Sequence, residues 1–557
     1  MADNLQYNLK NALKKLFKLV NLERKEISNI YFFAIISGLI QLSLPLGIQA
    51  IVSLLFGGLV SASLIVLICF VVFGVLLNGV FQIMQMRVTE RIQQRIFTRL
   101  TFAYAKHIPK LDLLGIDNYY LPELVNRFFD TTNLQKGLSK LLLDFPAATI
   151  QIIFGLILLS FYHPVFIVFG IALLTLVSMI LYLSSPAGFK TSMQESDFKY
   201  KVAHWLEEIS RAIKTFKFSQ KNNLHLEKTD QLTLGYLDSR TAHFDILVFQ
   251  YRIMIAFKVL ITASMLIIGT YLLVNQQINL GQFIASEIVI IAILSSVEKI
   301  IVSLETIYDV LTSIEKVDKL LEKPQDYLAH NNLTHQFDYN LPYAITTTNL
   351  CFSYPNKEVV LSNINIAINK GEKVCLTGAE GSGKTTLLRV LTGAYSGFTG
   401  NIAINGIPLK NIDTDKLREN VAVFFAQEEL FIGSLWDNLT LGNKTVSFEE
   451  VINTCEMVGL KSFIDLKPDG YNTLIDSQGQ KLSSSTVQKI LMARCFLYHP
   501  SLLLLENGWS GIESEYRTKI IDKLIKDKSF TLVALSDLEE FSNQCDKTIT
   551  LNKGKTV

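Results

Sequence analysis

Apolar residues in the first half of the chain are gathered into six long stretches. Each is close to the roughly 20 residues that an α-helix needs to cross the apolar part of a bilayer. Their approximate limits are Ile30–Phe56, Leu59–Met84, Ala147–Tyr162, Pro164–Leu183, Met254–Val274 and Phe283–Leu304. Very short turns without Lys, Arg, Asp or Glu join them in three pairs, at Gly57–Gly58, His163 and Asn275–Leu280. The pattern predicts six membrane-spanning helices.

The segments between these pairs are long and basic. Their cationic residues are Arg87, Arg91, Arg95, Arg99, Lys106 and Lys110 in the first and Arg211, Lys214, Lys217 and Lys221 in the second. Cytoplasmic loops carry an excess of Lys and Arg, so we expect both long segments and both termini in the cytoplasm. Helical periodicity in Glu90–His107 and His204–Phe216 predicts that the membrane helices continue below the bilayer.

Residues 1–27 are expected to hold an N-terminal amphipathic helix. Within residues 5–22, Leu and Phe recur at helical spacing with Lys between them, which is typical of a helix lying on the membrane surface. The alternative is a solvated basic tail. No small-residue cleavage site precedes the first apolar stretch, so we expect no removable signal peptide. In the spans, Pro45 predicts a kink. Glu287 lines a substrate path, pairs with a Ser or a backbone carbonyl of a neighbouring helix, or reaches the outer interface.

Composition agrees with membrane helices beside an ordinary folded domain. Hydrophobic residues make up 49% of the chain and charged residues only 18%, against roughly 25% in soluble domains. The net charge of +2 gives no argument for nucleic acid as a partner. The six cysteines are scattered without CxxC spacing, which argues against a disulfide framework or a zinc site. We expect a membrane domain over residues 28–322, a polar linker over 323–340 and an α/β domain over 341–557.

The decisive segment of the second half is KVCLTGAEGSGKTTLLRVL, in which an apolar strand, a Gly-rich turn and a helix follow one another. The turn fits GxxxxGK[ST], the phosphate loop of nucleotide-binding proteins. Glycines let backbone N–H groups converge on phosphate oxygens, and the helix presents its positive end to them. Lys384 is expected to reach the β and γ phosphates of ATP, and the Thr385 hydroxyl to bind Mg²⁺. The predicted ATP-binding set is Gly378, Ala379, Glu380, Gly381, Ser382, Gly383, Lys384, Thr385 and Thr386.

Together with four further segments, this half resembles the ATP-binding-cassette (ABC) exporter family. CFSYPNKEVVLSNINIAINKGEKV is similar to the family's opening strands, with Tyr354 where an aromatic ring stacks on adenine. VFFAQEELFIGSLWDNL resembles its glutamine loop, with Gln427 where the family contacts Mg²⁺ and the attacking water. DGYNTLIDSQGQKLSS resembles the approach to its signature sequence, and CDKTITLNKGKTV its closing strands.

The resemblance implies an α-helical six-span membrane domain of the type I exporter kind, followed by an α/β P-loop NTPase domain. It also implies a dimer that holds two ATP molecules, each between the phosphate loop of one chain and the signature of the other.

The chain departs from the family at three places. The signature LSGGQ is replaced by Leu482 followed by Ser483, Ser484, Ser485 and Thr486. At the end of the Walker B strand, Glu506 can still provide a metal ligand, whereas Asn507 replaces the glutamate that takes a proton from water. The switch histidine is replaced by Ser536, or by Asp537 if the register shifts by one residue. General-base assistance is worth about 10²–10⁴-fold, so we expect slow hydrolysis; harmless drift is the alternative.

The leading hypothesis is a half-subunit of an ABC exporter in a bacterial inner membrane, coupling ATP binding and weak hydrolysis to outward transport of an unknown substrate. The alternative is a catalytically silent ATP-binding subunit that gates or supports a partner half-transporter. The pattern of lost motifs slightly favours a heterodimer over a homodimer. We expect no peptidase domain, because only about 27 residues precede the first span. The substrate is not predictable from the sequence.

Overall fold

The computed structural model describes residues 8–56, 62–116, 120–218, 222–326, 338–339, 341–355, 358–425, 430–508 and 511–557. The chain divides into two compact units, which are described separately. The first consists of Met1–Pro109 and Tyr119–Glu322, and the second of Lys110–Asn118 and Lys323–Val557. The short segment Lys110–Asn118 thus belongs to the second unit although it lies within the predicted membrane domain.

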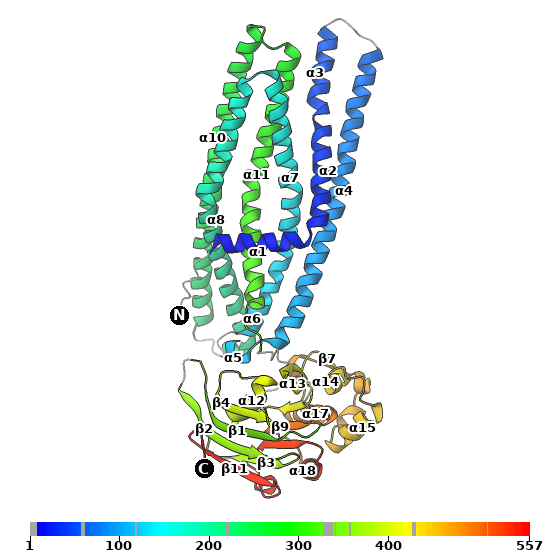
Figure 1. The fold of residues 1–557 in the computed structure, drawn as a ribbon, viewed down its shortest axis with the longest axis vertical. Helices are drawn as coiled ribbons and strands as arrows, with labels where there is room; N and C mark the ends of the chain where they lie inside the picture. Colours follow the sequence, from blue (N-terminus) through cyan, green and yellow to red (C-terminus); the bar gives the residue numbers. More distant parts are fainter. Residues whose placement is uncertain are drawn as a thin grey trace. The chain divides into compact units, whose positions relative to one another are not determined.

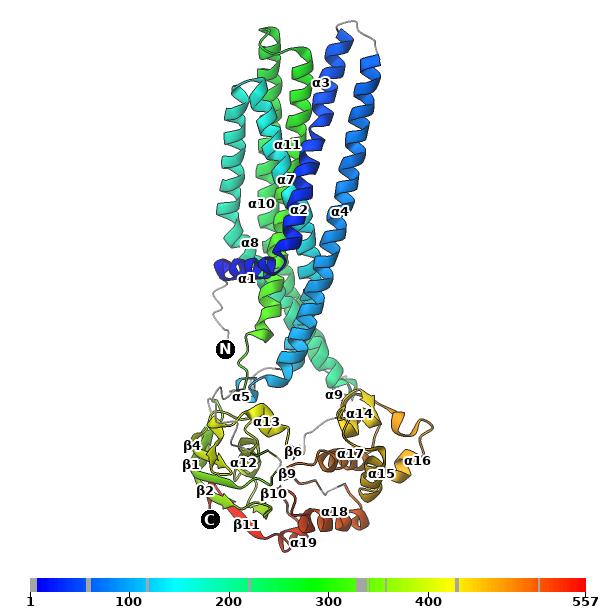
Figure 2. The ribbon, with the colours of Figure 1, turned by 45° about the vertical axis from the view of Figure 1, so that its right-hand side comes forward.

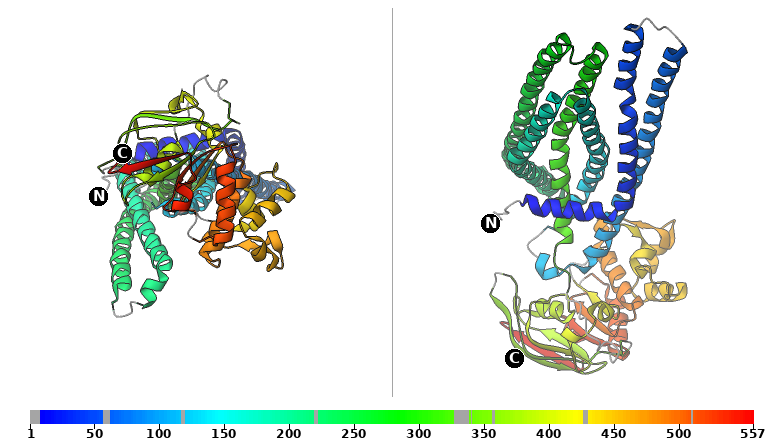
Figure 3. Two further views of the ribbon diagram at one scale, coloured as in Figure 1. Left: turned by 90° about the horizontal axis from the view of Figure 1, so that it is seen from below. Right: turned by 45° about the horizontal axis from the view of Figure 1, so that its top comes forward.

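The first unit is a bundle of long helices (Figure 1). Its helices are α1 (Leu9–Leu22), α2 (Arg24–Gln41), α3 (Ser43–Phe56), α4 (Ala62–His107), α6 (Leu121–Asn126), α7 (Asp130–Tyr162), α8 (Val165–Arg211), α9 (Ile213–Phe218), α10 (Leu224–Val274) and α11 (Leu280–Leu321). Three packed pairs dominate: α2 with α4, α7 with α11, and α8 with α10. In Figures 1 and 3 the members of the α8–α10 pair run side by side.

The first span is interrupted where Pro45 predicts a kink. Helix α2 ends at Gln41 and α3 begins at Ser43. Proline has no N–H, and its ring collides with the carbonyl four residues earlier, which here belongs to Gln41. The helix is therefore broken one turn before the proline rather than at it.

Five helical stretches in the described part of the chain are long and apolar enough to cross a membrane: 24–56, 62–110, 121–162, 165–211 and 224–274. The sixth expected span lies in α11, the most buried helix of the bundle. Its polar residues face partners inside the protein; the Ser296 hydroxyl, for example, donates to Gln151 Oε1 over 2.8 Å. Glu287 lies half-buried beside Gly269 of α10 and makes no hydrogen bond or ion pair to any described residue.

The second unit is built on two main sheets. A four-stranded antiparallel sheet has the order β2-β1-β4-β5, from β1 (Ile345–Ser353), β2 (Val359–Ile368), β4 (Thr399–Ile404) and β5 (Ile407–Pro408). A six-stranded sheet has the order β12-β11-β3-β10-β9-β6, from β3 (Lys373–Thr377), β6 (Val421–Phe424), β9 (Leu502–Glu506), β10 (Thr531–Leu535), β11 (Lys547–Asn552) and β12 (Lys555–Thr556). Its strands β11, β3, β10, β9 and β6 are mutually parallel. Of these, β3, β6, β9 and β10 are largely apolar and buried along their length, because both faces of the sheet are covered there.

Helices and one small strand pair complete this unit (Figure 2). They are α12 (Lys384–Leu391), α13 (Thr414–Arg418), α14 (Leu435–Thr440), α15 (Phe448–Met457), α16 (Lys461–Asp465), α17 (Ser484–Leu497), α18 (Ser514–Lys526) and α19 (Glu539–Ser542), with β7 (Gly433–Ser434) paired to β8 (Leu474–Ile475).

The segment before residue 117 is fixed to the second unit by several contacts. It contains the one-turn helix α5 (Leu113–Ile116). The Asp112 N–H donates to the Pro324 carbonyl over 3.0 Å, and Lys110 forms an ion pair with Asp415 near α13. Leu114 packs against the apolar core between the two sheets, close to Gly397. Because of these contacts, this short segment belongs to the second unit, although the long helices before and after it belong to the first.

Candidate functional site

The phosphate loop connects β3 to α12, as the sequence predicts, and its backbone requires glycine. Gly378 has φ +140°, Gly381 φ +74° and Gly383 φ +98°, conformations that residues with a side chain rarely adopt. A Cβ on Gly378 would lie 2.2 Å from the Leu551 carbonyl oxygen, and one on Gly383 would lie 2.9 Å from Leu361 Cδ2. The first and last of these glycines therefore also admit close packing of the loop against neighbouring strands.

The two side chains expected to hold phosphate and metal lie at the start of α12. Lys384 Nζ donates to the carbonyls of Gly378 and Ala379 over 2.6 and 2.8 Å, so its ammonium folds back over the loop. The Thr385 hydroxyl donates to Glu506 Oε1 over 2.6 Å. The loop and the end of β9 thus bring together two oxygen atoms of the kind that Mg²⁺ prefers.

The strand that leads into the loop is anchored by a buried cation. Lys373, at the first position of β3, is completely buried, and its ammonium donates to the Phe530 carbonyl over 2.6 Å. The same ammonium lies 3.7 Å from the centre of the Phe530 ring. Burial lowers the pKa of Lys373 to about 8, since a charged ammonium loses its hydration there.

A cavity of about 500 Å³ lies over the phosphate loop. Its lining includes most of the loop and the first residues of α12, with Val360, Glu506, Asn507, Leu535 and Asp537. Asn507 has φ +44°, in the left-handed region where asparagine is much more common than other residues with a side chain. The local backbone thus suits the amide that replaces the family glutamate.

Asp537 lines the cavity and Ser536 does not. Ser536 is buried, and its hydroxyl accepts the Leu538 N–H over 3.2 Å. Asp537 is exposed at the end of β10. Of the two residues considered for the switch position, Asp537 is therefore the one that lines this cavity.

The residues of the loop fit a nucleotide phosphate. The Ser382 hydroxyl is buried and has no hydrogen-bond partner in the described structure, so it is available to a ligand that enters the loop. Lys384 contributes a cation, and α12 begins at the loop with its unpaired N–H groups. No group of three or more His, Cys, Asp or Glu residues in the described ranges could hold a metal ion.

Tyr354 lies beside this loop. Its hydroxyl is 3.3 Å from the Thr386 hydroxyl, and its ring packs edge-on against Phe352 and Tyr395. Gln427, the predicted contact to metal and water, lies outside the described residues.

The altered signature begins α17. Ser483 is its N-cap, and its hydroxyl accepts the Thr486 N–H over 3.1 Å and contacts the Thr486 hydroxyl at 2.9 Å. Ser484 and Ser485 occupy the first turn of α17, and neither has a positive φ. The two glycines of the family signature are therefore not needed for backbone conformation here. The two serines differ from the glycines in having side chains, which occupy space where a ligand would approach the helix.

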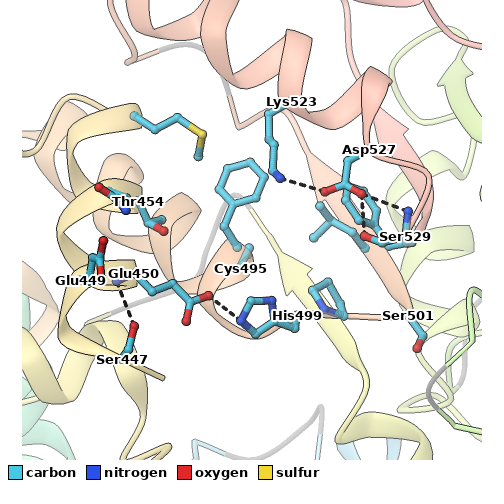
Figure 4. Close-up of a pocket in the computed structure, with 16 residues that line it drawn as sticks. Ser447, Glu449, Glu450, Thr454, Cys495, His499, Ser501, Lys523, Asp527 and Ser529 are labelled. Carbon is cyan, nitrogen blue, oxygen red and sulfur yellow. Dashed lines mark hydrogen bonds and ion pairs between the residues drawn. The ribbon is translucent and has the colours of Figure 1, made fainter. Parts of the chain in front are cut away.

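A second, larger cavity of about 670 Å³ lies elsewhere in the unit, at the starts of β9 and β10 (Figure 4). Two pairs of its side chains lie within ion-pair distance: Glu450 and His499 at 2.5 Å, and Lys523 and Asp527 at 2.9 Å. It lacks a glycine-rich loop and shares no residue with the first cavity. Although this cavity is larger, it is not the candidate site, because the groups that can bind phosphate line the cavity over the phosphate loop.

Most of the site was predictable from motifs, but three lining residues were not. Val360 and Leu535 carry no chemical signal, since they reach the cavity only through the pairing of their strands. Asp537 was weighed only as a register alternative. Its position two residues after the end of the buried strand β10 was the available signal, because parallel strands place the residues that follow them along one edge of the sheet.

The fold and site define a membrane protein that carries its own P-loop nucleotide-binding domain. A family model described as "ABC transporter" matches residues 361–508, and one described as "ABC transporter transmembrane region" matches residues 27–297. The chain belongs to the ABC transporter family and has the half-transporter organisation of its exporters, with one membrane domain and one nucleotide-binding domain. The matched domain implies that it binds ATP.

Known proteins support this assignment. Lactococcin-A transport/processing ATP-binding protein LcnC of Lactococcus lactis subsp. lactis is 23% identical over 469 residues, which cover 84% of this chain and 65% of that protein. Alpha-hemolysin translocation ATP-binding protein HlyB of Escherichia coli is 29% identical over 295 residues, covering 52% and 41%. Multidrug resistance protein pgp-1 of Caenorhabditis elegans is 32% identical over 225 residues, covering 40% and 17%. The chain spans less than two thirds of the length of each relative.

Among solved structures, a bacterial Atm1-family ABC exporter with ATP bound matches at a TM-score of 0.85. The match covers 96% of this chain and 94% of that one, at 16% sequence identity. It confirms the predicted fold: the type I exporter membrane domain and the α/β nucleotide-binding domain.

Proposed function

We propose that the chain is one half of an ATP-driven exporter, with both termini in the cytoplasm, that binds ATP firmly and hydrolyses it slowly on its own. The observation that carries this is the cavity over the phosphate loop, which Lys384, Thr385 and Glu506 line and where Asn507 stands at the position that needs a proton acceptor. The basic segments between the predicted spans support the orientation.

In this proposal each group has a limited task. Lys384 binds the β and γ phosphates, and the unpartnered Ser382 hydroxyl binds the nucleotide's phosphate oxygens. Thr385 and Glu506 hold Mg²⁺, which when bound neutralises charge on the phosphates. Asn507 orients water by hydrogen bonds but cannot accept its proton. Asp537 is the carboxylate beyond the metal shell that could take over that task, because it lines the same cavity.

The test is phosphate release by the purified full-length chain, measured together with ATP binding. We expect binding in the micromolar to millimolar range and turnover far below the order of 1–10 per second that brackets the median enzyme. Loss of ATP binding in Lys384→Ala is expected as well. Fast turnover that Lys384→Ala abolishes would contradict slow hydrolysis, and absence of ATP binding would contradict the site itself.

A silent ATP-binding subunit is the second candidate, favoured by the coincidence of Asn507 with the altered signature. In a heterodimer the two defects fall in different sites: Asn507 faces the partner's signature, and Ser483–Thr486 faces the partner's base. Repairing the signature alone (Ser484→Gly, Ser485→Gly, Thr486→Gln) is then expected to accelerate hydrolysis in the complex isolated from cells. In a homodimer that repair alone should do little. We favour the heterodimer slightly.

The substrate is proposed to be a secreted polypeptide. Two relatives are named for transport of lactococcin A and translocation of alpha-hemolysin, which supports this class. The substrate class is tested by mass spectrometry of the polypeptides in the medium. Cells that carry the unaltered chain are compared with cells that carry Lys384→Ala. No difference in exported polypeptides would refute the substrate class without affecting the ATP site.

A further inference from the structure

Helix α1 packs onto the bundle through one apolar side. Ala12 is completely buried, and Leu9, Leu13 and Leu16 are partly buried against the same apolar cluster of the first unit. Their spacing places these four residues on a single helix face. The helix that the sequence predicts at the membrane surface thus packs this apolar face on protein, which leaves its opposite side for that surface.

Ionic contacts hold the helix at its middle, through Lys15, and just beyond its C-terminal end, through Glu23. Lys15 Nζ lies 2.8 Å from Glu315 Oε2 and 2.8 Å from Glu322 Oε1, both near the end of α11. Glu23, in the turn to α2, is buried and accepts from Arg99 of α4 over 2.7 Å. The helix is thus held to α11 and α4, and its rotation about its own axis is set.

The opposite side of α1 is a basic stripe made of Lys10, Lys14 and Lys18. These residues follow one another at intervals of four and are all exposed. No described residue forms a hydrogen bond or ion pair with their ammonium groups, in contrast to Lys15. Phe17 borders the stripe and is 69% exposed, and Leu22 at its end is 58% exposed. Cations beside exposed apolar groups are typical of a helix that meets the headgroup layer of a membrane.

The position of α1 agrees with that layer. The helix runs crosswise to the long helices of the bundle (Figures 1 and 2). It ends at Leu22, and the first predicted apolar stretch begins at Ile30. Eight residues of helix correspond to roughly 12 Å, so α1 lies just outside the hydrocarbon.

We propose that the basic stripe of α1 binds anionic phospholipids of the inner leaflet. Lys10, Lys14 and Lys18 contact lipid phosphates while Phe17 and Leu22 enter the region between headgroups and acyl chains. The proposal is independent of transport and hydrolysis. Since α1 is tied to α11 and α4, lipid bound to the stripe stabilises one arrangement of these two helices.

The experiment uses the full-length chain in detergent, titrated with phosphatidylglycerol or with phosphatidylcholine, and counts bound lipids by native mass spectrometry. Photoactivatable phosphatidylglycerol then locates the contact by peptide mapping. The test variant is Lys10→Gln/Lys14→Gln/Lys18→Gln, which leaves Lys15 intact. The matched control, Lys370→Gln/Lys410→Gln/Lys444→Gln, removes the same charge from exposed lysines of the second unit.

Each lysine near an anionic surface contributes about fivefold to binding, so the triple variant is expected to bind phosphatidylglycerol at α1 roughly 100-fold more weakly. The control should bind it as the unaltered chain does, cross-links should fall within residues 9–22, and phosphatidylcholine should bind weakly to all three. Equal phosphatidylglycerol binding by test and control variants overturns the proposal. So does displacement of the lipid by inorganic phosphate at the same concentration, which would indicate a site for the free anion. A thermal unfolding midpoint equal to that of the unaltered chain shows that the test variant is folded.

Discussion

The substitution Asn507→Glu tests the chemical reasoning most directly, because it returns a proton acceptor to a site whose phosphate loop is intact. A glutamate at this position must adopt the φ of +44° that Asn507 has, or the backbone must shift. Left-handed backbone costs most residues about 1–2 kcal/mol, and asparagine less. We therefore expect the variant to be less stable than the unaltered chain by about 1 kcal/mol while it becomes the better catalyst.

General-base assistance is worth about 10²–10⁴-fold, or roughly 3–5 kcal/mol of activation free energy, which exceeds the backbone cost. The gain should be largest when the signature is repaired in the same chain, since an altered signature limits each site of a homodimer. The assay is phosphate release at saturating Mg-ATP by the reconstituted full-length chain. Thermal unfolding measured in parallel reports the expected loss of stability.

Matched variants decide what an unexpected result means. Lys384→Ala must abolish the gained activity, since otherwise the phosphate released comes from a contaminant. A repaired chain that binds ATP as before but hydrolyses it no faster would refute the assignment of Asn507 to the base position. If the unaltered chain already hydrolyses ATP fast and Asp537→Asn abolishes this activity, Asp537 is the general base. It then compensates for the family glutamate that Asn507 replaces.

Three further predictions concern the fold. Gly378→Ala should abolish ATP binding and destabilise the chain by more than 1 kcal/mol, because its Cβ would lie 2.2 Å from the Leu551 carbonyl oxygen; Gly381→Ala, with nothing within 4 Å, is the milder control. Between pH 8 and 10.5 the unfolded chain binds the Lys373 proton more tightly than the folded chain does, so the free energy of unfolding should rise with pH. Urea unfolding of the unaltered chain should show this rise relative to Lys373→Met. The same pH dependence in both proteins would contradict the prediction. A cysteine at Gln277 should react with an impermeant maleimide in intact cells, and labelling only after permeabilisation would contradict the six-span topology.

The fold was largely predictable because two strong patterns act locally. A run of about 20 apolar residues suits only a membrane helix, and a strand–GxxxxGK[ST]–helix segment suits only a phosphate loop. The break of the first span was anticipated at Pro45 but lies at Gln41–Ser43, because the collision falls on the preceding turn. The packing of α1 on protein was not predictable, because an apolar helix face has the same sequence pattern whether lipid or a neighbouring helix covers it.

The site was predictable where a motif fixes the backbone and not where pairing of distant strands decides. Gly378 and Lys384 act within one turn, so their positions follow from local sequence. Whether Ser536 or Asp537 faces the cavity depends on where β10 ends against β3 and β9, which no local pattern contains. The left-handed conformation of Asn507 is of the same kind, since its N–H donates to the Leu535 carbonyl of a strand far away in the sequence.

The attachment of α5 to the second unit has a practical consequence for anyone who expresses the nucleotide-binding domain alone. A fragment cut at the linker would lose Leu114 from its place against the apolar core and leave Asp415 without Lys110. The apolar surface near Gly397 would then be exposed to water, and such a fragment is expected to aggregate or to need solubilising additives. Supplying residues 110–118 as a synthetic peptide, or splicing them ahead of residue 323, should restore soluble, monomeric material.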